Sequence, residues 1–283
     1  MTTTGYASAP GAGTIINAIA TWKGSAFGID LKTNAKVRLN GDGRITGIIK
    51  EGGDSGLIER CVELVFERFG YQDGAIVTTS SEIPIASGLK SSSAAANAAV
   101  LAALDAIGES MEPVDAALIG VQAAKDAGVT ITGAFDDAAA SMLGGVVVTD
   151  NRSSTLILWE ELDSEVMIYV PRTQAYSSQT DVGRSRLIAP WVDMAYELCI
   201  KGEYGKAMTL NGFLYCSALG FDPEPMMMAL ETGIEGVSLS GTGPAYTALA
   251  SREQAGELAD AWSALDGRVI RTKINNSGAK IQR

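Results

Sequence analysis

A short stretch of small and polar residues, GLKSSSAAANA at positions 88–98, could bind an anionic group. A helix N-terminus exposes unpaired backbone N–H groups and carries a partial positive charge. A Gly/Ser loop that leads into a helix can therefore wrap a phosphate. The hydroxyls of Ser91, Ser92 and Ser93 could also touch phosphate or ligate a magnesium ion, and Lys90 adds a point charge. The simpler alternative is that Ser92 or Ser93 is only a helix N-cap.

The stretch does not match two common nucleotide-binding motifs. It is not a Walker A loop, because Leu89 rather than Gly precedes Lys90 and no Gly lies five residues before Leu89. It is not a GxGxxG turn either. Any anion site here must depend on another loop geometry.

Two further segments hold residue types that suit a ligand site. ITGAFDDAAASMLGG, at positions 131–145, sets the adjacent acids Asp136 and Asp137 among small residues, although a solvated loop would explain them equally well. SLSGTGPAYTAL, at positions 238–249, places Gly241 and Gly243 in a tight turn between apparent strands. Such a turn lets the backbone approach a ligand closely, or it is simply a hairpin turn.

The composition excludes several kinds of chemistry. The 283 residues contain no histidine, which rules out His-dependent triads, HExxH metalloproteases and imidazole bases. Cys61, Cys199 and Cys216 are widely spaced and odd in number, which favours reduced core thiols over disulfides or a zinc site. The remaining candidates are carboxylates, Lys, Ser, Arg, backbone amides and a metal held by oxygen.

The charge and the apolar runs bear on partners and location. A formal net charge of -11 argues against a nucleic-acid backbone or an anionic membrane as the main partner. The first 13 residues contain no basic segment followed by an apolar run, so we expect no secretory signal. The longest apolar run, at positions 94–104, contains Asn97 and is shorter than the roughly 20 residues of a membrane span. We expect a cytoplasmic protein with a small-molecule substrate, and the oligomeric state stays open.

The elements that must position these residues alternate between strand and helix patterns. Strands are expected at 14–20, 35–39, 44–49, 75–80, 144–150, 155–160, 165–171, 245–250 and 268–274, and helices at 55–70, from 94, at 113–128, 191–217 and 252–262. Because the order has no regular βαβ rhythm, we predict an α+β fold in two lobes. The boundary is placed between two strand-like runs near 161–164, which gives domains at 1–162 and 163–283.

The three segments, in this order, resemble the GHMP small-molecule kinase superfamily. Its signature loop reads roughly Pro-x-x-x-Gly-Leu-Gly-Ser-Ser-Ala-Ala, and this chain has Pro84, Gly88, Leu89, the three serines and Ala94, with Lys90 where Gly is usual. More narrowly, SAPGAGTIINAIATWKGSAFGIDL, GLKSSSAAANA, GVTITGAFDDAAAS and TKINNSGAKI resemble the archaeal type of shikimate kinase.

The resemblance implies a fold, a reaction and cofactors. The expected fold has an N-terminal lobe with a left-handed βαβ unit and a C-terminal ferredoxin-like lobe. The expected reaction moves the γ-phosphoryl group of ATP, with Mg²⁺, to a hydroxyl of shikimate, giving shikimate 3-phosphate for chorismate and aromatic amino acid biosynthesis. Homoserine kinase or another GHMP small-molecule kinase is the alternative enzyme. A non-catalytic relative that senses a nucleotide or sugar is the other.

The resemblance also implies roles for individual residues. The expected ATP-binding residues are Pro84, Ile85, Ala86, Ser87, Gly88, Leu89, Lys90, Ser91, Ser92, Ser93, Ala94, Gly241, Thr242 and Gly243. Ser92, Ser93 and Asp126 are the candidate magnesium ligands. Asp136 or Asp137 would orient and deprotonate the acceptor hydroxyl, and we prefer Asp136.

Two positions depart from the family pattern or need a partner. Several GHMP kinases have a Lys after Pro-Gly in their first motif, whereas Ala12 stands here. Either Lys90 or the metal supplies that positive charge, or the reaction resembles that of homoserine kinase, which also lacks this Lys. The carboxylate of shikimate needs a cation inside an acidic protein, and Arg suits a carboxylate. Arg172, Arg184 and Arg186 are the candidates, with Arg184 preferred because Gly183 lets the backbone turn before it.

Overall fold

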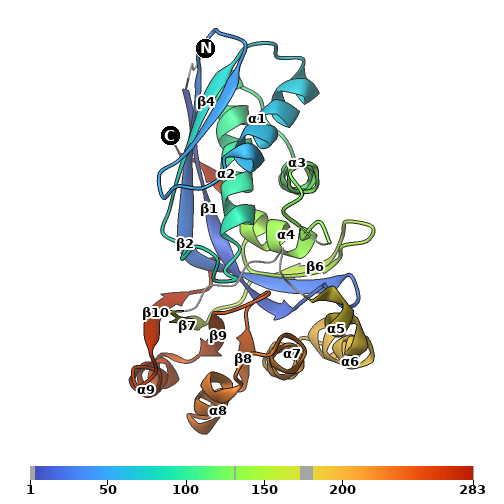
Figure 1. The fold of residues 1–283 in the computed structure, drawn as a ribbon, viewed down its shortest axis with the longest axis vertical. Coiled ribbons are helices and arrows are strands. Elements are labelled where there is room, and N and C mark those ends of the chain that lie inside the picture. The colour runs from blue at the N-terminus through green and yellow to red at the C-terminus, as the bar shows by residue number, and fades with distance from the viewer. Residues whose placement is uncertain (1–3, 131, 173–180, 283) are drawn as a thin grey trace.

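The computed structural model describes residues 4–130, 132–172 and 181–282, which form two sheets, each covered by helices on one face (Figure 1). The strands are β1 Thr4–Ile16, β2 Lys23–Leu39, β3 Ile45–Ile49, β4 Ala75–Ser81, β5 Val146–Asp150, β6 Thr155–Glu160, β7 Glu165–Pro171, β8 Gly236–Leu239, β9 Tyr246–Ala250, β10 Gly267–Lys273 and β11 Lys280–Ile281. The helices are α1 Gly56–Phe69, α2 Ser91–Ile107, α3 Pro113–Asp126, α4 Phe135–Leu143, α5 Val182–Leu187, α6 Ala189–Ile200, α7 Tyr204–Leu219, α8 Glu224–Glu231 and α9 Arg252–Trp262.

The first sheet has the order β11-β1-β2-β4-β3, with β5 paired to β2 and β6 to β5. Strand β3 runs parallel to β4 and is joined to it through α1, so these elements form the βαβ unit that the sequence predicts. Helix α2 lies against β1, because small residues allow close approach: a Cβ added at Gly5 would lie 2.1 Å from the Ala102 carbonyl oxygen. All alanines of α2 except Ala95 are buried, and the helix packs against β1 and β2 as well as against α1, α3 and α4.

The second sheet is antiparallel, with the order β10-β7-β9-β8. Along the chain the order is β7, the helices α5 to α8, β8, β9, α9 and β10, which is the βαββαβ plan of a ferredoxin-like unit. Helices α7, α8 and α9 lie on one side of this sheet (Figure 1). The α+β fold in two lobes is confirmed.

Several elements differ from the sequence predictions, including β2, which spans Lys23–Leu39 rather than 35–39, and α5 and α8, which were not expected. The first strand spans Thr4–Ile16 rather than starting at Thr14, and the helix expected at 191–217 is two helices, divided where Gly202 takes a positive φ of 78°. Helix α4 was not expected as a separate element. The last strand, β11, was not expected and returns to pair with β1 in the first sheet. The domain boundary between residues 162 and 163 stays a prediction.

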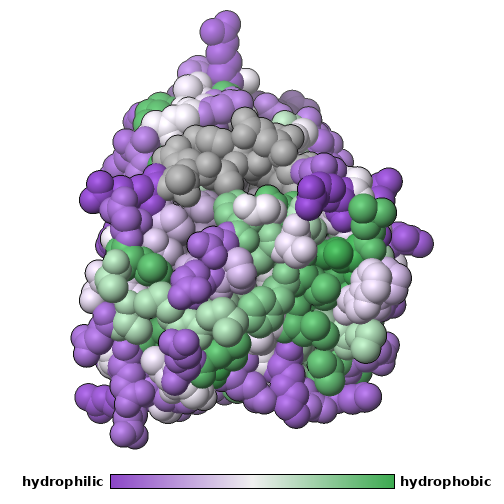
Figure 2. Space-filling model, turned by 60° about the horizontal axis from the view of Figure 1, so that its bottom comes forward, coloured by the Kyte–Doolittle hydropathy of each residue, from purple (hydrophilic) through white to green (hydrophobic). Residues whose placement is uncertain are grey.

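On the face shown in Figure 2, hydrophobic side chains form a band across the surface. Leu187, Trp191 and Met194, on α5 and α6, are among the exposed large hydrophobic residues. Among the described residues, every helix is too short or too polar to cross a lipid bilayer.

Candidate active site

The loop between β4 and α2 turns sharply before the helix begins. Ala86, Gly88 and Lys90 all have positive φ angles, of 51°, 82° and 63°. Lys90 is the N-cap of α2, and no side chain caps the helix there. The simpler interpretation, that Ser92 or Ser93 is the N-cap, is wrong, because both lie inside the first helical turn. The first N–H groups of α2 are thus left for a ligand, as an anion site requires.

The turn between β8 and β9 holds this loop in place from the second sheet. The Ser240 hydroxyl donates to the Gly88 carbonyl oxygen at 2.9 Å, and the Ala245 amide donates to the Ser87 carbonyl oxygen at 3.1 Å. A Cβ added at Gly88 would lie 2.1 Å from the Ser240 carbonyl oxygen, so only glycine permits this contact. The predicted turn at Gly241 is therefore confirmed as a tight turn, and it supports the loop.

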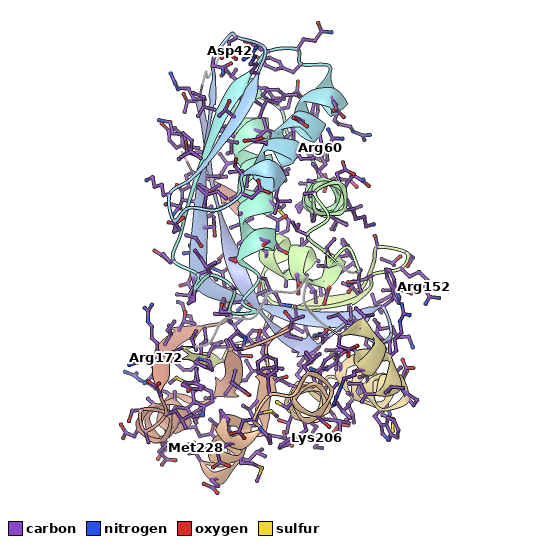
Figure 3. The ribbon with its side chains drawn as sticks, in the orientation of Figure 1. Asp42, Arg60, Arg152, Arg172, Lys206 and Met228 are labelled. Carbon is purple, nitrogen blue, oxygen red and sulfur yellow. The ribbon has the colours of Figure 1, made fainter. Side chains whose placement is uncertain are left out.

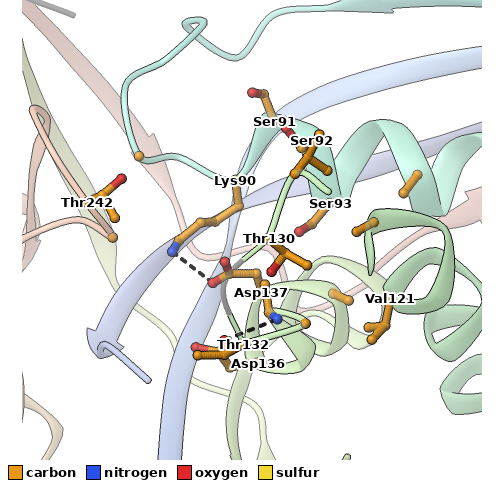
Figure 4. A pocket seen from close by; sticks show the side chains of 18 of the residues that line it. Lys90, Ser91, Ser92, Ser93, Val121, Thr130, Thr132, Asp136, Asp137 and Thr242 are labelled. Atoms are coloured by element: carbon orange, nitrogen blue, oxygen red, sulfur yellow. Dashed lines mark hydrogen bonds and ion pairs between the residues drawn. The ribbon is translucent and has the colours of Figure 1, made fainter. Parts of the chain in front are cut away.

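A cavity of about 400 Å³ opens between the two sheets beside α2 (Figure 4). Its size lies in the range of small-molecule sites. Most predicted nucleotide-binding residues line it, namely Ile85, Ala86, Ser87, Gly88, Lys90, Ser91, Ser92, Ser93, Gly241 and Thr242. Pro84, Leu89, Ala94 and Gly243 do not line it, and Leu89 and Ala94 are buried core residues.

The two adjacent acids lie in the first turn of α4 and both line the cavity. Asp137 forms an ion pair with Lys90 (Oδ1 to Nζ, 2.9 Å), and both side chains are largely buried, at 14% and 11% exposed (Figure 4). Asp136 is buried and accepts a hydrogen bond from Asn151 Nδ2 at 2.7 Å. The interpretation as a solvated loop is therefore wrong.

Burial sets the protonation of Asp136. Desolvation, followed by the nearby charge of Asp137, raises the pKa of the Asp136 carboxyl to about 7, while Lys90 and the Asn151 hydrogen bond act to lower it. A carboxylate with a pKa near neutrality is well matched to taking a proton from a hydroxyl group. Asp136 is the better candidate base, since Asp137 is engaged by Lys90.

Gly24, on β2, leaves just enough room for the Asp136 carboxyl group. A Cβ added at Gly24 would lie 2.5 Å from Asp136 Oδ2 and 2.6 Å from its Cγ. We expect Gly24→Ala to displace the carboxyl group and to lower kcat by roughly 10- to 100-fold, since small misplacements are costly in catalysis. Steady-state kinetic assays that compare the kcat of Gly24→Ala with that of the original protein test this expectation.

Gly256→Ala is the matched control, because a Cβ there meets no atom within 4 Å. It should leave kcat unchanged. A folded Gly24→Ala variant with the original kcat would show that the observed position of the carboxyl group does not matter for turnover.

Four more predicted site residues, the candidate magnesium ligand Asp126 and the three arginines, do not line the cavity. Asp126 pairs with Arg60 Nε at 2.8 Å, which holds the pKa of its carboxyl below the usual value. Arg172 is 81% exposed and pairs with Asp266, and Figure 3 shows it at the outer edge of the second sheet. Arg184 donates to the carbonyl oxygens of residues 217 and 218, and Arg186 is exposed. Positions 173–180 of the Arg-containing segment lie outside the described residues.

Several residues that line the cavity were missed from the sequence. Asn17 donates through Nδ2 to the Gly241 carbonyl oxygen at 2.7 Å and so links β1 to the β8–β9 turn. Thr130 and Thr132 lie before α4, and Leu57 and Val129 add apolar surface. Asn17, Val129, Thr130 and Thr132 lie in segments that carry the family resemblance, but their residue types alone assign them no role. Leu57 lies outside those segments.

The described residues offer no cluster of acids for the predicted magnesium ion. In the described part of the chain, no three His, Cys, Asp or Glu side chains gather into a metal site. The cavity instead offers the hydroxyls of Ser92 and Ser93. Mg²⁺ is often bound through few protein ligands together with substrate phosphates and water. The serine hydroxyls therefore fit an ion that enters with a nucleotide.

Comparison with known proteins identifies the fold. A family model described as the GHMP kinases N terminal domain matches residues 56–145. A homoserine kinase structure from Cytophaga hutchinsonii aligns with a TM-score of 0.79 at 20% identity, covering 100% of this chain and 98% of that one. A mevalonate kinase structure from Methanococcus jannaschii aligns with a TM-score of 0.78 at 15% identity, covering 96% and 98%. The fold is thus that of the GHMP kinases.

Sequence relatives narrow the class. The chain is 63% identical to the shikimate kinase of Methanosarcina mazei, over 99% of this chain and 97% of the relative. It is 44% identical to the shikimate kinase of Methanothermobacter thermautotrophicus, over 96% of each chain. The chain belongs to the family of the archaeal shikimate kinases within the GHMP kinases.

Proposed function

We propose that this chain is a shikimate kinase, which transfers the γ-phosphoryl group of ATP to shikimate and yields shikimate 3-phosphate and ADP. The observation that carries the proposal is the shared cavity. Within it, the start of α2, with its free N–H groups and serine hydroxyls, faces the acids at the start of α4. A phosphate site and a candidate base thus lie on one cavity, in a family whose relatives act on shikimate.

The expected roles follow from this arrangement. The loop from Gly88 and the first turn of α2 would hold the ATP phosphates, and Ser92 and Ser93 would hold Mg²⁺, which neutralises charge on the transferring group. Lys90, which points toward the acids, would supply the positive charge that the first motif lacks at Ala12. Asp136 would orient the acceptor hydroxyl and take its proton.

The carboxylate of shikimate still needs a cation. Arg172, Arg184 and Arg186 remain our predicted partners, with Arg184 preferred, although in the described structure none of them lines the cavity. Lys90 is a cation that does line it. Alanine variants at the three arginines, assayed with shikimate as the varied substrate, test whether the KM for shikimate depends on one of them.

The function is tested by ATP turnover with purified protein against shikimate, homoserine and mevalonate. Of the three acceptors, we expect only shikimate to give ADP release in the presence of ATP, together with an equal amount of phosphorylated product. Homoserine kinase is the main alternative, because a homoserine kinase shares the fold. Turnover of homoserine without turnover of shikimate would overturn the assignment, and absence of turnover with every acceptor would favour a binding protein.

The double variant Ser92→Ala, Ser93→Ala tests the phosphate site. Neither hydroxyl caps α2, so stability should change little. Loss of hydrogen bonds to charged groups should weaken MgATP binding by roughly 10- to 100-fold. Titration calorimetry with MgATP and a thermal melt measure the two effects. Unchanged affinity in the folded variant would remove the serines from the site.

A further inference from the structure

A buried amide, Asn151, holds the candidate base from outside the acidic motif. Asn151 directly follows β5 and is 2% exposed. Its Nδ2 donates to Asp136 Oδ1 at 2.7 Å, and its Oδ1 accepts from the Asp136 backbone N–H at 3.1 Å. One side chain thus binds both the carboxyl group and the backbone of the same residue.

The second contact explains how α4 can begin without a local cap. Its N-cap, Ala134, has a positive φ of 48° and offers no side-chain hydrogen bond. Asn151 Oδ1 therefore satisfies an N–H of the first turn that would otherwise lack a partner. The start of α4, and with it the direction of the Asp136 side chain, depends on a residue 15 positions later.

Asn151 is itself fixed by hydrogen bonds. The Thr149 hydroxyl donates to Asn151 Oδ1 at 2.8 Å, which orients the amide so that Nδ2 faces the carboxyl group. Asn151 Nδ2 also lies 3.4 Å from Thr132 Oγ1, a residue that lines the cavity. The Asn151 N–H donates to the Trp22 carbonyl oxygen at 2.8 Å. The amide is a rigid part of the site.

We infer that Asn151 is a positioning residue for the phosphoryl-transfer reaction, which fixes the Asp136 carboxyl group at the acceptor and keeps it available as a base. The inference rests on the proposed function. Asn151 is not among the residues that line the cavity, so it acts on turnover through the residues it contacts, of which Asp136 carries the candidate base. Thr149 supports the same arrangement from β5.

The pKa of the Asp136 carboxyl group depends on the charged groups around it and on the hydrogen bond from Asn151. Asp137 on α4 raises the pKa of the Asp136 carboxyl, Lys90 at the start of α2 lowers it, and Tyr215 on α7 also faces it. The hydrogen bond from Asn151 stabilises the ionised form and so lowers this pKa. Removing the donor should shift the acidic limb of the kcat profile to higher pH.

The test compares Asn151→Leu and Asn151→Asp with the original protein. We expect kcat to fall by roughly 10- to 100-fold in both variants, because a small displacement of the catalytic carboxyl group from its productive position is costly. The acidic limb of the kcat profile should move up by on the order of one pH unit, most in Asn151→Asp, where a second carboxyl group faces Asp136. Thr149→Val should shift it in the same direction by less. MgATP affinity should stay unchanged.

Asn97→Leu is the matched control. Asn97 is a fully buried amide that also binds α4, donating to the Ala138 carbonyl oxygen at 2.9 Å. Its loss should lower thermal stability without moving the acidic limb. If folded Asn151 variants keep the original kcat and the original pH profile while Asp136→Asn is inactive, the inference about Asn151 fails and the proposed role of Asp136 stands. If Asp136→Asn is also fully active, the proposed role of Asp136 fails.

Discussion

Asp136→Asn should lower kcat by about 10²- to 10⁴-fold, the usual range for loss of a general base. The amide keeps the shape of the side chain, so packing against Gly24 should survive. MgATP affinity should persist, because the phosphate loop lies at the start of α2. Steady-state kinetics and calorimetry on one preparation measure both quantities. In the original protein, kcat should fall as pH drops below about 7, where the carboxyl group becomes protonated.

The same substitution should change stability in a pH-dependent way. The pKa of Asp136 is raised from its ordinary value of 3.8 to about 7 in the folded state. The contribution of this carboxyl group to folding stability is therefore complete below pH 3.8 and is lost as the pH rises through about 7. Thermal melts should therefore show that the stability of Asp136→Asn, measured relative to the original protein, is higher at pH 8 than at pH 5. Asp137→Asn is the comparison: a larger loss of kcat there would make Asp137 the base.

Lys90→Met should lower kcat/KM for MgATP by about 10²-fold or more. Lys90 is a cation on the cavity, and its loss leaves the Asp137 charge unpaired beside the phosphates. An unpaired, desolvated charge costs on the order of 2 to 5 kcal/mol. Methionine is unbranched like lysine and lacks only the equivalent of the terminal ammonium group, and it meets the same φ of 63° at this position, so the loop backbone is not the variable. Initial-rate assays with varied MgATP measure the loss.

Two further variants separate the causes. Lys90→Met with Asp137→Asn removes both charges, so any recovered activity measures the penalty of the unpaired carboxylate. Lys90→Arg keeps the charge and should retain part of the rate. If Lys90→Met has the original kcat/KM, the positive charge near the acceptor comes from the metal or from another residue.

The loop before α2 and the acidic pair could be predicted because each is continuous in the sequence. Gly88, Lys90 and the serines follow one another into a helix, although hydrogen bonds from the distant β8–β9 turn also hold the loop. The function of Asn151 could not be predicted in this way. It lies 15 residues from Asp136 along the chain, and only the pairing of β2 with β5 brings it to the start of α4.

The same reason explains the errors in the fold prediction. Strands and helices with clear hydrophobic patterns, such as α1, α3 and α9, were expected close to their observed bounds. Helix α4 was missed because its cap comes from Asn151 rather than from a local Ser, Thr or Asp, so the usual start signal is absent. In the described structure Arg184 binds backbone carbonyl groups at the end of α7, and a contact of Arg172, Arg184 or Arg186 with shikimate stays a prediction.

The return of β11 to the first sheet has a consequence for biosynthesis. A ribosome makes β1 early and β11 only after the whole second sheet, so the β1 edge that β11 covers stays open while the chain between them is synthesised. Nascent domains usually fold in order of synthesis, and an open strand edge invites pairing with other chains. The first sheet therefore reaches its full strand order only after residues 280–281 have been made.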